Sequence, residues 1–248
     1  MFARPFVLFG RCTHFAFASL WAGFASIRRP HEVASQLFHI LIGALPLGFV
    51  AGVALGVVVW VHLHNVVEQV YAAKVPEYLA LAVALEFAPL GAGLVIGGRT
   101  GASLAAELSS MKLTEQIDAL EAMGVSPMRR LVGPRVLACM LALPLLTVFL
   151  GAFALGSSFL AEMIGGTMFP TPYQNALLAG LARSKLAAAI LKTTVFGWLI
   201  AVAGCWCGLH PEPGAEGVGI AATRGVVASI FAVMIANVLL VQVIQMLP

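Results

Sequence analysis

Five long apolar stretches restrict the fold of this chain more than any other feature. They run roughly over residues 36–62, 78–108, 133–162, 186–209 and 220–246. A helix needs about 20 mainly apolar residues to cross the hydrocarbon core of a bilayer, and each stretch is long enough. Only 10% of the residues are charged, against about 25% in soluble domains, which excludes a soluble enzyme or a disordered linker. We therefore predict an all-α membrane protein with five transmembrane helices in a single domain, residues 1–248.

The segment before these stretches, residues 1–30, mixes aromatic with basic residues. Arg4, Arg11 and His14 alternate with several phenylalanines and precede Trp21. A cleaved signal peptide has one basic end followed by an uninterrupted apolar run, which this segment lacks. Basic residues on one face and aromatic residues on the other are typical of a helix that lies in the membrane interface. We predict an interfacial amphipathic helix, with a cleaved signal or a true span as alternatives.

The lysines and arginines near the ends of the stretches predict the orientation. With a cytoplasmic N-terminus, ten lie inside: Arg4, Arg11, Arg28, Arg29, Arg99, Lys112, Arg129, Arg130, Arg135 and Arg224. Four then lie outside: Lys74, Arg183, Lys185 and Lys192. Cytoplasmic loops carry an excess of Lys and Arg, so this orientation is favoured. It makes residues 109–132 a cytoplasmic loop and puts the C-terminus on the periplasmic side. The net charge of +3 is too small to suggest binding to nucleic acid.

The cytoplasmic loop contains the one long amphipathic segment, approximately residues 111–124. Its apolar positions at helical spacing are Leu113, Ile117, Leu120 and Met123 or Gly124, and its polar positions are Lys112, Glu115, Asp118 and Glu121. Helices that rest on a membrane surface are usually basic on the polar face, whereas this one has three acids. That composition favours docking into a groove of a partner protein over a connector on the membrane surface. Gly124 is suited to a helix C-cap, and Ser126-Pro127 to the start of a new helix.

Small residues recur every four positions in the second stretch, at Gly93, Gly97, Gly101 and Ala105. Such spacing forms one face without bulky side chains, along which helices in lipid can approach closely. A phosphate-binding P-loop would need a lysine and a preceding strand, and neither is present. We predict helix packing for this face and no nucleotide site in the chain.

Two ionisable residues fall inside the apolar stretches. Glu86 lies about nine residues into the second stretch, where a carboxylate is costly and tends to face a cavity or a partner. The alternative is that Glu86 lies nearer the surface and is simply solvated. For Lys192, several residues inside the fourth stretch, we predict an ammonium group that extends to the membrane interface.

Neither the histidines nor the cysteines have the spacing of a metal site. His62 and His64 have no third ligand nearby, and Cys205, Cys207 and His210 lack paired CxxC spacing. We predict interfacial residues rather than metal ligands at these positions. The four cysteines fall in apolar stretches without a disulfide framework, and no catalytic constellation is apparent.

Several motifs together resemble the MlaE family of ABC transporter permeases. The first block contains Leu85-Glu86-Phe-Ala-Pro89, Gly98-Arg99-Thr-Gly101 through Glu107, Met111 through Pro127, and Pro134-Arg135. The second contains Leu191-Lys192-Thr193 and Glu216 through Val227. The similarity extends over most of residues 80–240, and the run from Gly98 to Gln116 is its most specific part.

The resemblance implies a permease subunit with one interfacial helix and five spans. Family members form a homodimer in the inner membrane, on two copies of a cytoplasmic ATPase that binds ATP and magnesium. Outside they contact a periplasmic MCE-domain protein, and some systems add a STAS-domain protein. The complexes move phospholipids between the inner membrane and the outer envelope, or a sterol or fatty acid in related systems. Hydrolysis then belongs to the partner, so we expect no enzyme activity and no cofactor in this chain.

The resemblance also suggests roles for particular residues. Glu86 would lie at the lipid cavity of the dimer. The coupling helix seated on the ATPase would contain Thr114, Glu115, Gln116, Ile117, Asp118, Leu120, Glu121, Met123 and Gly124. The family often has an arginine directly before the glutamate, whereas this chain has Leu85, which leaves the headgroup preference open. Competing hypotheses are a membrane enzyme that uses Glu86 and a histidine, and a scaffold that transports nothing.

Overall fold

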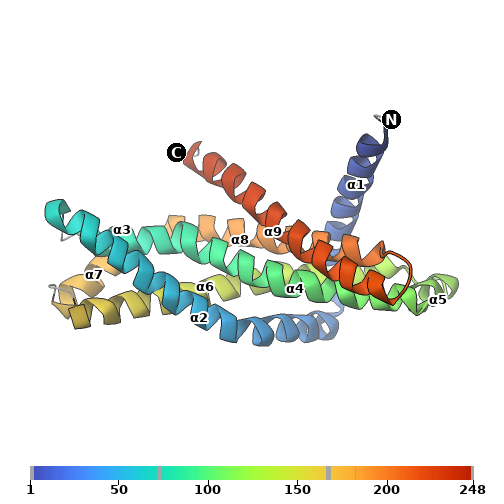
Figure 1. Cartoon of the computed structure of the whole chain (residues 1–248), viewed down its shortest axis with the longest axis horizontal. Helices are drawn as coiled ribbons and strands as arrows, with labels where there is room; N and C mark the ends of the chain where they lie inside the picture. Colours follow the sequence, from blue (N-terminus) through green and yellow to red (C-terminus); the bar gives the residue numbers. More distant parts are fainter. Residues whose placement is uncertain (1–2, 72–73, 166–168, 182, 247–248) are drawn as a thin grey trace.

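The computed structural model describes residues 3–71, 74–165, 169–181 and 183–246, and nearly all of them are helical (Figure 1). This described part contains no strand. Five of its helical stretches are long and apolar enough to cross a membrane: Pro30–His64, Val75–Leu113, Met128–Gly165, Leu186–Leu209 and Ala215–Val243. The predicted all-α membrane protein with five spans is confirmed, while residues 1–2 of the predicted interfacial helix and the last two residues of the predicted domain lie outside the described residues.

In chain order the helices are α1 (Ala3–Ala25), α2 (Pro30–Tyr71), α3 (Val75–Ala82), α4 (Ala88–Leu113), α5 (Gln116–Ala122), α6 (Gly133–Gly165), α7 (Pro170–Gly180), α8 (Arg183–Leu209) and α9 (Ala215–Met246). A 3-10 segment, η1 (Ser26–Arg28), follows α1, and π-helical segments precede α4 and α6: η3 (Val83–Phe87) and η4 (Met128–Val132). Most helices extend beyond the predicted stretches, because apolar composition marks only the part suited to hydrocarbon, whereas helical hydrogen bonds continue past it.

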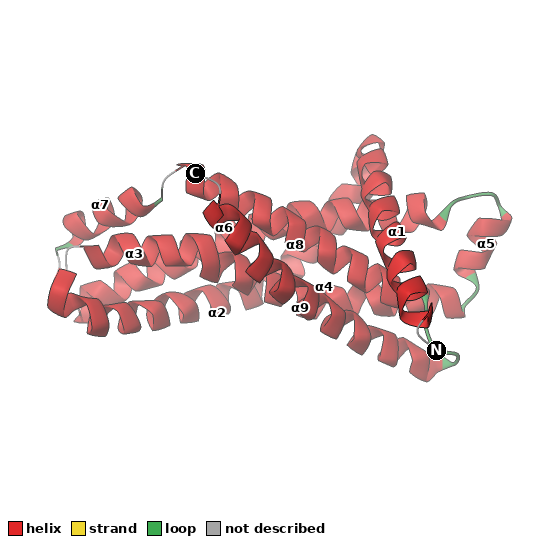
Figure 2. Cartoon of the chain, turned by 90° about the horizontal axis from the view of Figure 1, so that it is seen from above, coloured by secondary structure: helices red, strands yellow, loops and turns green. Residues whose placement is uncertain are grey.

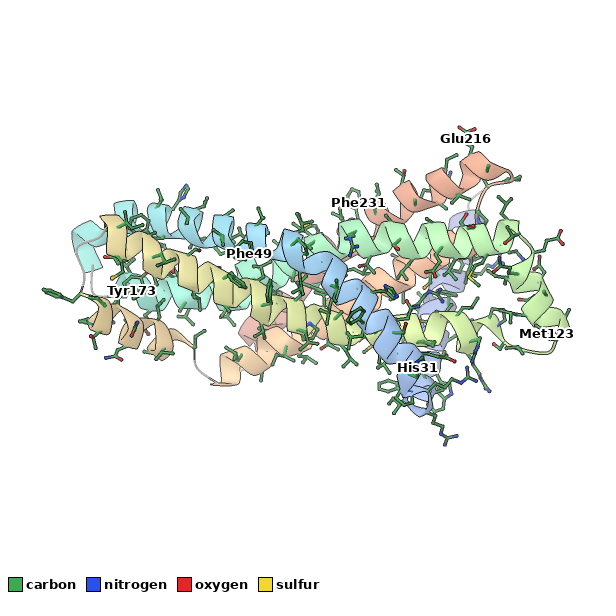
Figure 3. The ribbon with its side chains drawn as sticks, turned by 90° about the horizontal axis from the view of Figure 1, so that it is seen from below. His31, Phe49, Met123, Tyr173, Glu216 and Phe231 are labelled. Atoms are coloured by element: carbon green, nitrogen blue, oxygen red, sulfur yellow. The ribbon has the colours of Figure 1, made fainter. Side chains whose placement is uncertain are left out.

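The long helices run side by side along one axis, with α5 at one end of the bundle and α7 at the other (Figure 1). We call these the α5 end and the α7 end. The later part of α9 diverges from the bundle, and α1 stands at a steep angle to its long axis in both views (Figures 1 and 2). The loop between α8 and α9 returns to the α5 end, where Met123 and Glu216 both lie (Figure 3).

One side of α1 packs on the bundle and another is exposed. The ring of Phe15 meets Trp206 of α8 edge-on, with centroids 5.2 Å apart. Phe17, Trp21 and Phe24 remain 71%, 76% and 56% exposed. A helix that crosses the bundle axis and leaves aromatic rings uncovered has the arrangement expected of an interfacial helix.

The contact between α2 and α6 depends on a second row of glycines that the sequence analysis did not single out. Gly48, Gly52 and Gly56 lie four apart on α2 and face α6. A Cβ on Gly52 would lie 2.7 Å from the carbonyl oxygen of Leu150, so the two backbones meet directly. The hydroxyl of Ser157 also donates to the carbonyl of Val53 across this contact, at 3.1 Å. The spacing is the same as in the predicted glycine face, and it was a usable signal.

The helix α7 was not predicted. Its sequence is short and polar, with Pro170 in its first turn. Tyr173 and Leu177 bury their side chains against α3, in a small core with Leu79 and Val83. A Cβ on Gly180 would lie 2.7 Å from the carbonyl oxygen of Glu77, so α7 rests closely on α3. Tertiary packing, rather than its own hydrophobicity, holds this helix.

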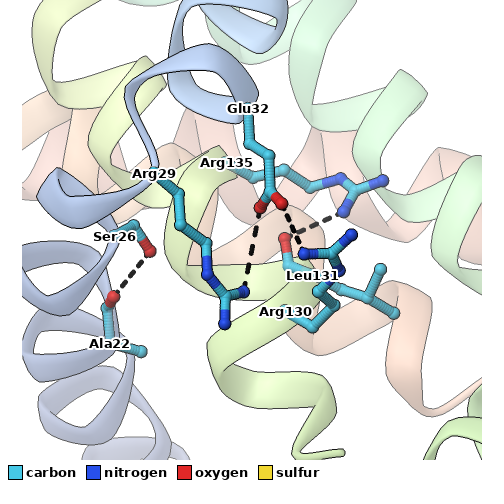
Figure 4. A network of polar contacts seen from close by, with 7 residues as sticks. All are labelled: Ala22, Ser26, Arg29, Glu32, Arg130, Leu131 and Arg135. Carbon is cyan, nitrogen blue, oxygen red and sulfur yellow. Dashed lines mark hydrogen bonds and ion pairs between the residues drawn. The ribbon is translucent and has the colours of Figure 1, made fainter.

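The larger core lies toward the α5 end and joins α2, α4, α6, α8 and α9; it contains Ile40, Ile96, Leu104, Val136, Leu143, Phe196, Ile200 and Val233. Polar contacts tie the start of α2 to η4 at the same end (Figure 4). The Glu32 carboxylate accepts from Arg130 at 2.5 Å and lies 3.9 Å from Arg29. The Arg135 guanidinium donates to the carbonyl of Leu131 at 2.8 Å. These contacts fix the α1–α2 junction against the beginning of α6.

Candidate functional site

Glu86 lies in a π-helical interruption of the second membrane stretch. The segment Val83–Phe87 joins α3 to α4, and the backbone N–H of Ala88 donates to the carbonyl of Val83. Pro89 follows and has no N–H to offer the Leu85 carbonyl four residues earlier, so a regular α-helix cannot pass through unchanged. Single π-turns inside α-helices frequently occur at functional sites. The local sequence thus sets Glu86 in a backbone that differs from the helices around it.

Lys192 of α8 is the ionic partner of Glu86. Its Nζ lies 2.8 Å from a carboxylate oxygen of Glu86 and donates to the freed carbonyl of Leu85 at 3.2 Å. The lysine side chain is 1% exposed, whereas that of Glu86 is 44% exposed. The prediction that the ammonium of Lys192 extends to the membrane interface is wrong. A buried ammonium beside a carboxylate and an unpaired carbonyl is better satisfied than one stretched along an apolar helix.

This pair changes the meaning of Leu85. The sequence analysis noted that no arginine precedes Glu86, but a cation still meets the carboxylate, from a helix 106 residues further along the chain. Its position in the apolar stretch was visible in the sequence. Its partner was not, because the pairing depends on how α8 packs on η3.

An apolar groove of about 270 Å³ lies beside η3, between α6 and α8. Its lining includes Val83, Ala84, Pro144, Val148, Leu186 and Ile190. Ala189 and Thr193, which flank Lys192 in the chain, also line it. The Glu86–Lys192 pair is therefore close along the chain to a surface suited to hydrocarbon.

The predicted small-residue face of α4 lies against α8 and α9. A Cβ on Gly93 would lie 2.9 Å from Val233, and one on Gly101 would lie 2.6 Å from the hydroxyl of Ser229. Gly97 is looser, with its nearest neighbour at 3.6 Å. At Ala105, the approach comes from α8 and α9, because Cβ atoms on Gly208 and Gly225 would meet it at 2.8 and 2.7 Å. The four positions do not bear equally on the contact.

The predicted coupling segment is not one continuous helix. The helix α4 ends at Leu113, Thr114 and Glu115 form a turn, and α5 begins at Gln116. Glu115 adopts left-handed backbone angles, with φ of 58°, and the ammonium of Lys112 pairs with Asp118 across the turn. The hydroxyl of Thr114 folds back onto the carbonyl of Ser110 at 2.9 Å and also accepts from the Gln116 amide. These local polar contacts divide a helical pattern that the sequence left unbroken.

The end of α5 has the geometry that its sequence predicted. Gly124 has φ of 74°, its N–H donates to Glu121, and the N–H of Val125 donates to Leu120. This is the Schellman pattern, which requires a left-handed residue at the glycine position. The next helix begins at Pro127, with the carbonyl of Ser126 accepting its first hydrogen bonds.

The side chains of this segment differ sharply in exposure. Ile117 is 2% exposed and anchors α5, whereas Leu120 is half-buried. Met123, Leu113 and Val125 are 68%, 43% and 36% exposed. The acids Glu115, Asp118 and Glu121 are exposed as well. The α5 end of the bundle thus presents an acidic surface with uncovered apolar side chains.

A polar cluster at the α7 half of the bundle was missed. Glu162 of α6 is 3% exposed and accepts from the indole N–H of Trp60 at 2.7 Å. His64 stacks on Trp60, with ring centroids 4.9 Å apart, and lies 3.8 Å from Glu162. The two helices meet 102 residues apart in the chain, so no local pattern indicates the contact.

The other histidines and cysteines have structural partners. His62 and His210 each bond through Nδ1 to a carbonyl one turn earlier in the same helix, at 2.8 and 3.0 Å. All four cysteines are free, and Cys205 is buried while Cys207 is half-buried. Within the described residues, no three or more His, Cys, Asp or Glu side chains gather as metal ligands would.

Comparison with known proteins gives a consistent result. The sequence model of one protein family, described as Permease MlaE, matches residues 33–243. A probable ABC transporter permease of Rickettsia typhi is 34% identical over 166 residues, which cover 67% of this chain and 64% of the relative. One from Synechocystis is 38% identical over 167 residues, covering 64% of this chain and 60% of the relative.

A chloroplast protein of Arabidopsis thaliana, named Trigalactosyldiacylglycerol 1, is 37% identical over 163 residues. The match covers 65% of this chain and 46% of the plant protein. This chain therefore spans somewhat less than two thirds of the length of the curated relatives that it matches.

Proposed function

Because this chain belongs to the MlaE family of permeases, we propose that it is the membrane subunit of an ABC transporter that moves phospholipids. The transporter would work between the inner membrane and the outer envelope, driven by a separate cytoplasmic ATPase that holds ATP and magnesium. The family match over residues 33–243 carries this proposal. In this scheme the chain itself performs no chemistry and only reshapes a path for lipid.

A lipid substrate has two further supports. The name of the chloroplast relative refers to a diacylglycerol lipid. In this chain, the groove beside η3 offers about 270 Å³ of space with an almost wholly apolar lining, which suits an acyl chain. The half-exposed carboxylate of Glu86 lies on the same segment, and we propose that it lines the cavity that receives the lipid.

The proposed orientation puts the α5 end in the cytoplasm and the C-terminus in the periplasm. The α5 end carries the Arg29, Arg129 and Arg130 side chains, all exposed, in keeping with the excess of basic residues on cytoplasmic loops. The exposed aromatics of α1 would then lie in the cytoplasmic face of the inner membrane. On the family resemblance, we further propose a homodimer, a periplasmic MCE-domain partner and, in some assemblies, a STAS-domain protein on the ATPase.

We propose that α5 and its flanking turns form the contact with the ATPase. The segment combines three exposed acids with Met123, Leu113 and Val125, which have no cover within the described chain. An apolar anchor with a charged rim is a common design of docking surfaces, in which the apolar core contributes affinity and the rim contributes specificity. The Lys112–Asp118 pair would hold α5 at a fixed angle to α4, so that motion of α5 reaches the glycine face of α4.

A matched pair of charge reversals tests the docking surface. Glu121→Lys changes an exposed acid of α5, and Glu216→Lys makes the same change at the same end of the bundle but on α9 (Figure 3). We expect Glu121→Lys to weaken association with the ATPase roughly tenfold, about 1.4 kcal/mol, and Glu216→Lys to leave it unchanged. Co-purification from membranes and ATP hydrolysis by the complex are the measurements. Equal association of both variants would remove α5 from the coupling role.

The substrate class has its own test. Mass spectrometry of lipids retained by the purified complex should find phospholipids, and phospholipid should raise its ATP hydrolysis in reconstituted membranes. Retention of a sterol or fatty acid instead would overturn the phospholipid assignment. Absence of any lipid-stimulated hydrolysis would favour a scaffold over a transporter.

A further inference from the structure

Arg99 presents a charge without a partner in a membrane stretch. It lies in the middle of α4 and is exposed. In the described part of the chain, no carboxylate forms an ion pair with it. An unpaired arginine at the centre of a membrane helix costs about 2.5–3.5 kcal/mol on insertion scales, so such residues normally find an anion or a water-filled site. This chain supplies Glu86 with a cation but leaves Arg99 uncompensated.

The guanidinium of Arg99 nevertheless has a defined place. A Cβ built on Gly43 of α2 would overlap the guanidinium, so the absence of a side chain at Gly43 gives the group a recess against the α2 backbone. A glycine that admits a charged group holds it in one orientation, which lowers the cost of ordering it around a ligand. The adjacent glycine of α4, Gly98, has nothing within 4 Å, so this side of α4 is open.

The guanidinium lines a polar pocket of about 450 Å³ between α2 and α4. Six of its lining residues are polar: Gln36, His39, Arg99, Thr100, Ser103 and Glu107. Amide, imidazole and hydroxyl groups can each donate hydrogen bonds to an oxyanion. The one carboxylate is already engaged, because Glu107 lies 3.0 Å from the buried guanidinium of Arg135. The pocket therefore keeps one net positive charge, together with several neutral donors.

The pocket lies close to the level at which α1 meets the bundle. Phe15 of α1 packs on Trp206, and Gly204 of α8 faces the backbone of Gly101 on α4. Trp206 is two residues beyond Gly204 toward the α5 end, and Arg99 is two residues before Gly101. The backbone of Arg99 is thus about 6 Å of helix rise deeper than the contact with α1. With α1 in the interface, this is the depth of lipid phosphates and glycerol groups.

Apolar side chains flank the pocket. Phe38 and Ile42 beside it on α2 are 61% and 50% exposed, and Leu94 on α4 is 38% exposed. A soluble anion gains nothing from such a rim, whereas the acyl chains of a lipid would lie along it. We propose that this pocket binds the phosphate of a phospholipid headgroup from the leaflet at the α5 end, with Arg99 as its counter-ion.

This site is separate from the one around Glu86. Thirteen residues separate Glu86 from Arg99, roughly 20 Å of helix rise. The inference takes the interfacial position of α1 from the proposed function but needs neither the ATPase nor transport. Failure of transport would leave it standing, and failure of this site would leave the permease assignment standing.

Site-specific crosslinking can test the proposal. The full chain, without ATPase, would be placed in nanodiscs containing a phosphatidylethanolamine analogue with a diazirine on its headgroup. A diacylglycerol that carries the same diazirine but no phosphate serves as the second probe. Peptide mapping should find the phospholipid on residues 36–43 and 99–107, about tenfold more than the phosphate-free lipid.

Three variants locate the effect. Arg99→Gln removes the charge, and Gly43→Ala keeps the charge but pushes the guanidinium out of its recess. Both should lower crosslinking at these peptides about tenfold. Arg129→Gln, which removes an exposed arginine at the same end but outside the pocket, should change nothing. If Arg99→Gln fails to fold, Gly43→Ala decides the matter, because only the flexible end of one side chain has to move.

Three outcomes would overturn the proposal. Equal crosslinking of the two lipids would show that phosphate is not recognised. Unchanged crosslinking in Gly43→Ala and Arg99→Gln would exclude Arg99 as the counter-ion. Complete competition by inorganic phosphate would assign the pocket to a soluble anion rather than to a lipid.

Discussion

Glu86 and Arg99 lie on one membrane stretch and meet the cost of charge in different ways. Glu86 is joined by a buried ammonium at 2.8 Å, supplied by another helix of the same chain. Arg99 has a recess at Gly43 and a polar pocket, but no described anion. The first charge is part of the protein's own packing. The second is prepared for something from outside, so only its loss should leave the fold intact.

The largest expected effect comes from breaking the compensated charge. Lys192→Met keeps the length of the side chain but leaves Glu86 beside apolar neighbours and removes the donor to the Leu85 carbonyl. Removing one member of a buried ion pair typically costs 3–5 kcal/mol, and the partial exposure of Glu86 favours the lower end, about 3 kcal/mol. Reversible unfolding in mixed micelles measures this loss.

A double variant separates the pair from the packing of the lysine alone. Adding Glu86→Gln to Lys192→Met removes the unpaired charge and should recover about 1–2 kcal/mol. No recovery would mean that the pair does not determine stability, and the contrast with Arg99 would lose its basis.

A smaller effect extends the comparison to the glycines on the packed and open sides of α4. A Cβ at Gly101 would lie 2.6 Å from the Ser229 hydroxyl and 3.1 Å from the Gly225 carbonyl, so Gly101→Ala should cost about 1–3 kcal/mol by overpacking. Gly98→Ala introduces the same atom where nothing lies within 4 Å and should cost less than about 0.5 kcal/mol. Thermal unfolding of the two variants side by side is sufficient. Equal losses would contradict the assignment of the two sides.

The smallest effect concerns the uncompensated charge. In a detergent without phosphate groups, Arg99→Gln should change the free energy of unfolding by less than about 0.5 kcal/mol, because no described protein carboxylate loses a partner. Added phospholipid should then stabilise the parent protein more than the variant. A loss near that of Lys192→Met would indicate that Arg99 is a structural residue after all.

Several features could be predicted because their causes are local. Each span follows from the cost of exposing backbone groups to hydrocarbon, which only a helix of sufficient apolar length avoids. The C-cap at Gly124 follows from the one residue type that adopts a left-handed backbone without strain. The spacing of Gly93, Gly97 and Gly101 indicated a packed face, and the same rule would have found Gly48, Gly52 and Gly56.

The break between α4 and α5 shows the limit of such patterns. Leu113, Ile117 and Leu120 keep helical spacing, but the hydroxyl of Thr114 and the Lys112–Asp118 pair favour a turn at Glu115. Periodicity does not register a competition between local hydrogen bonds that differ little in free energy.

The sequence by itself determined the class of protein, the number of apolar spans and the positions of the charges inside them, because burial of apolar area and backbone hydrogen bonding act along each segment. Only the tertiary structure decided which charge is paired. Lys192 meets Glu86, and Trp60 meets Glu162, across more than a hundred residues each. A buried ion finds its partner through the packing of whole helices, and in this fold that packing leaves Arg99 facing a pocket instead of a carboxylate.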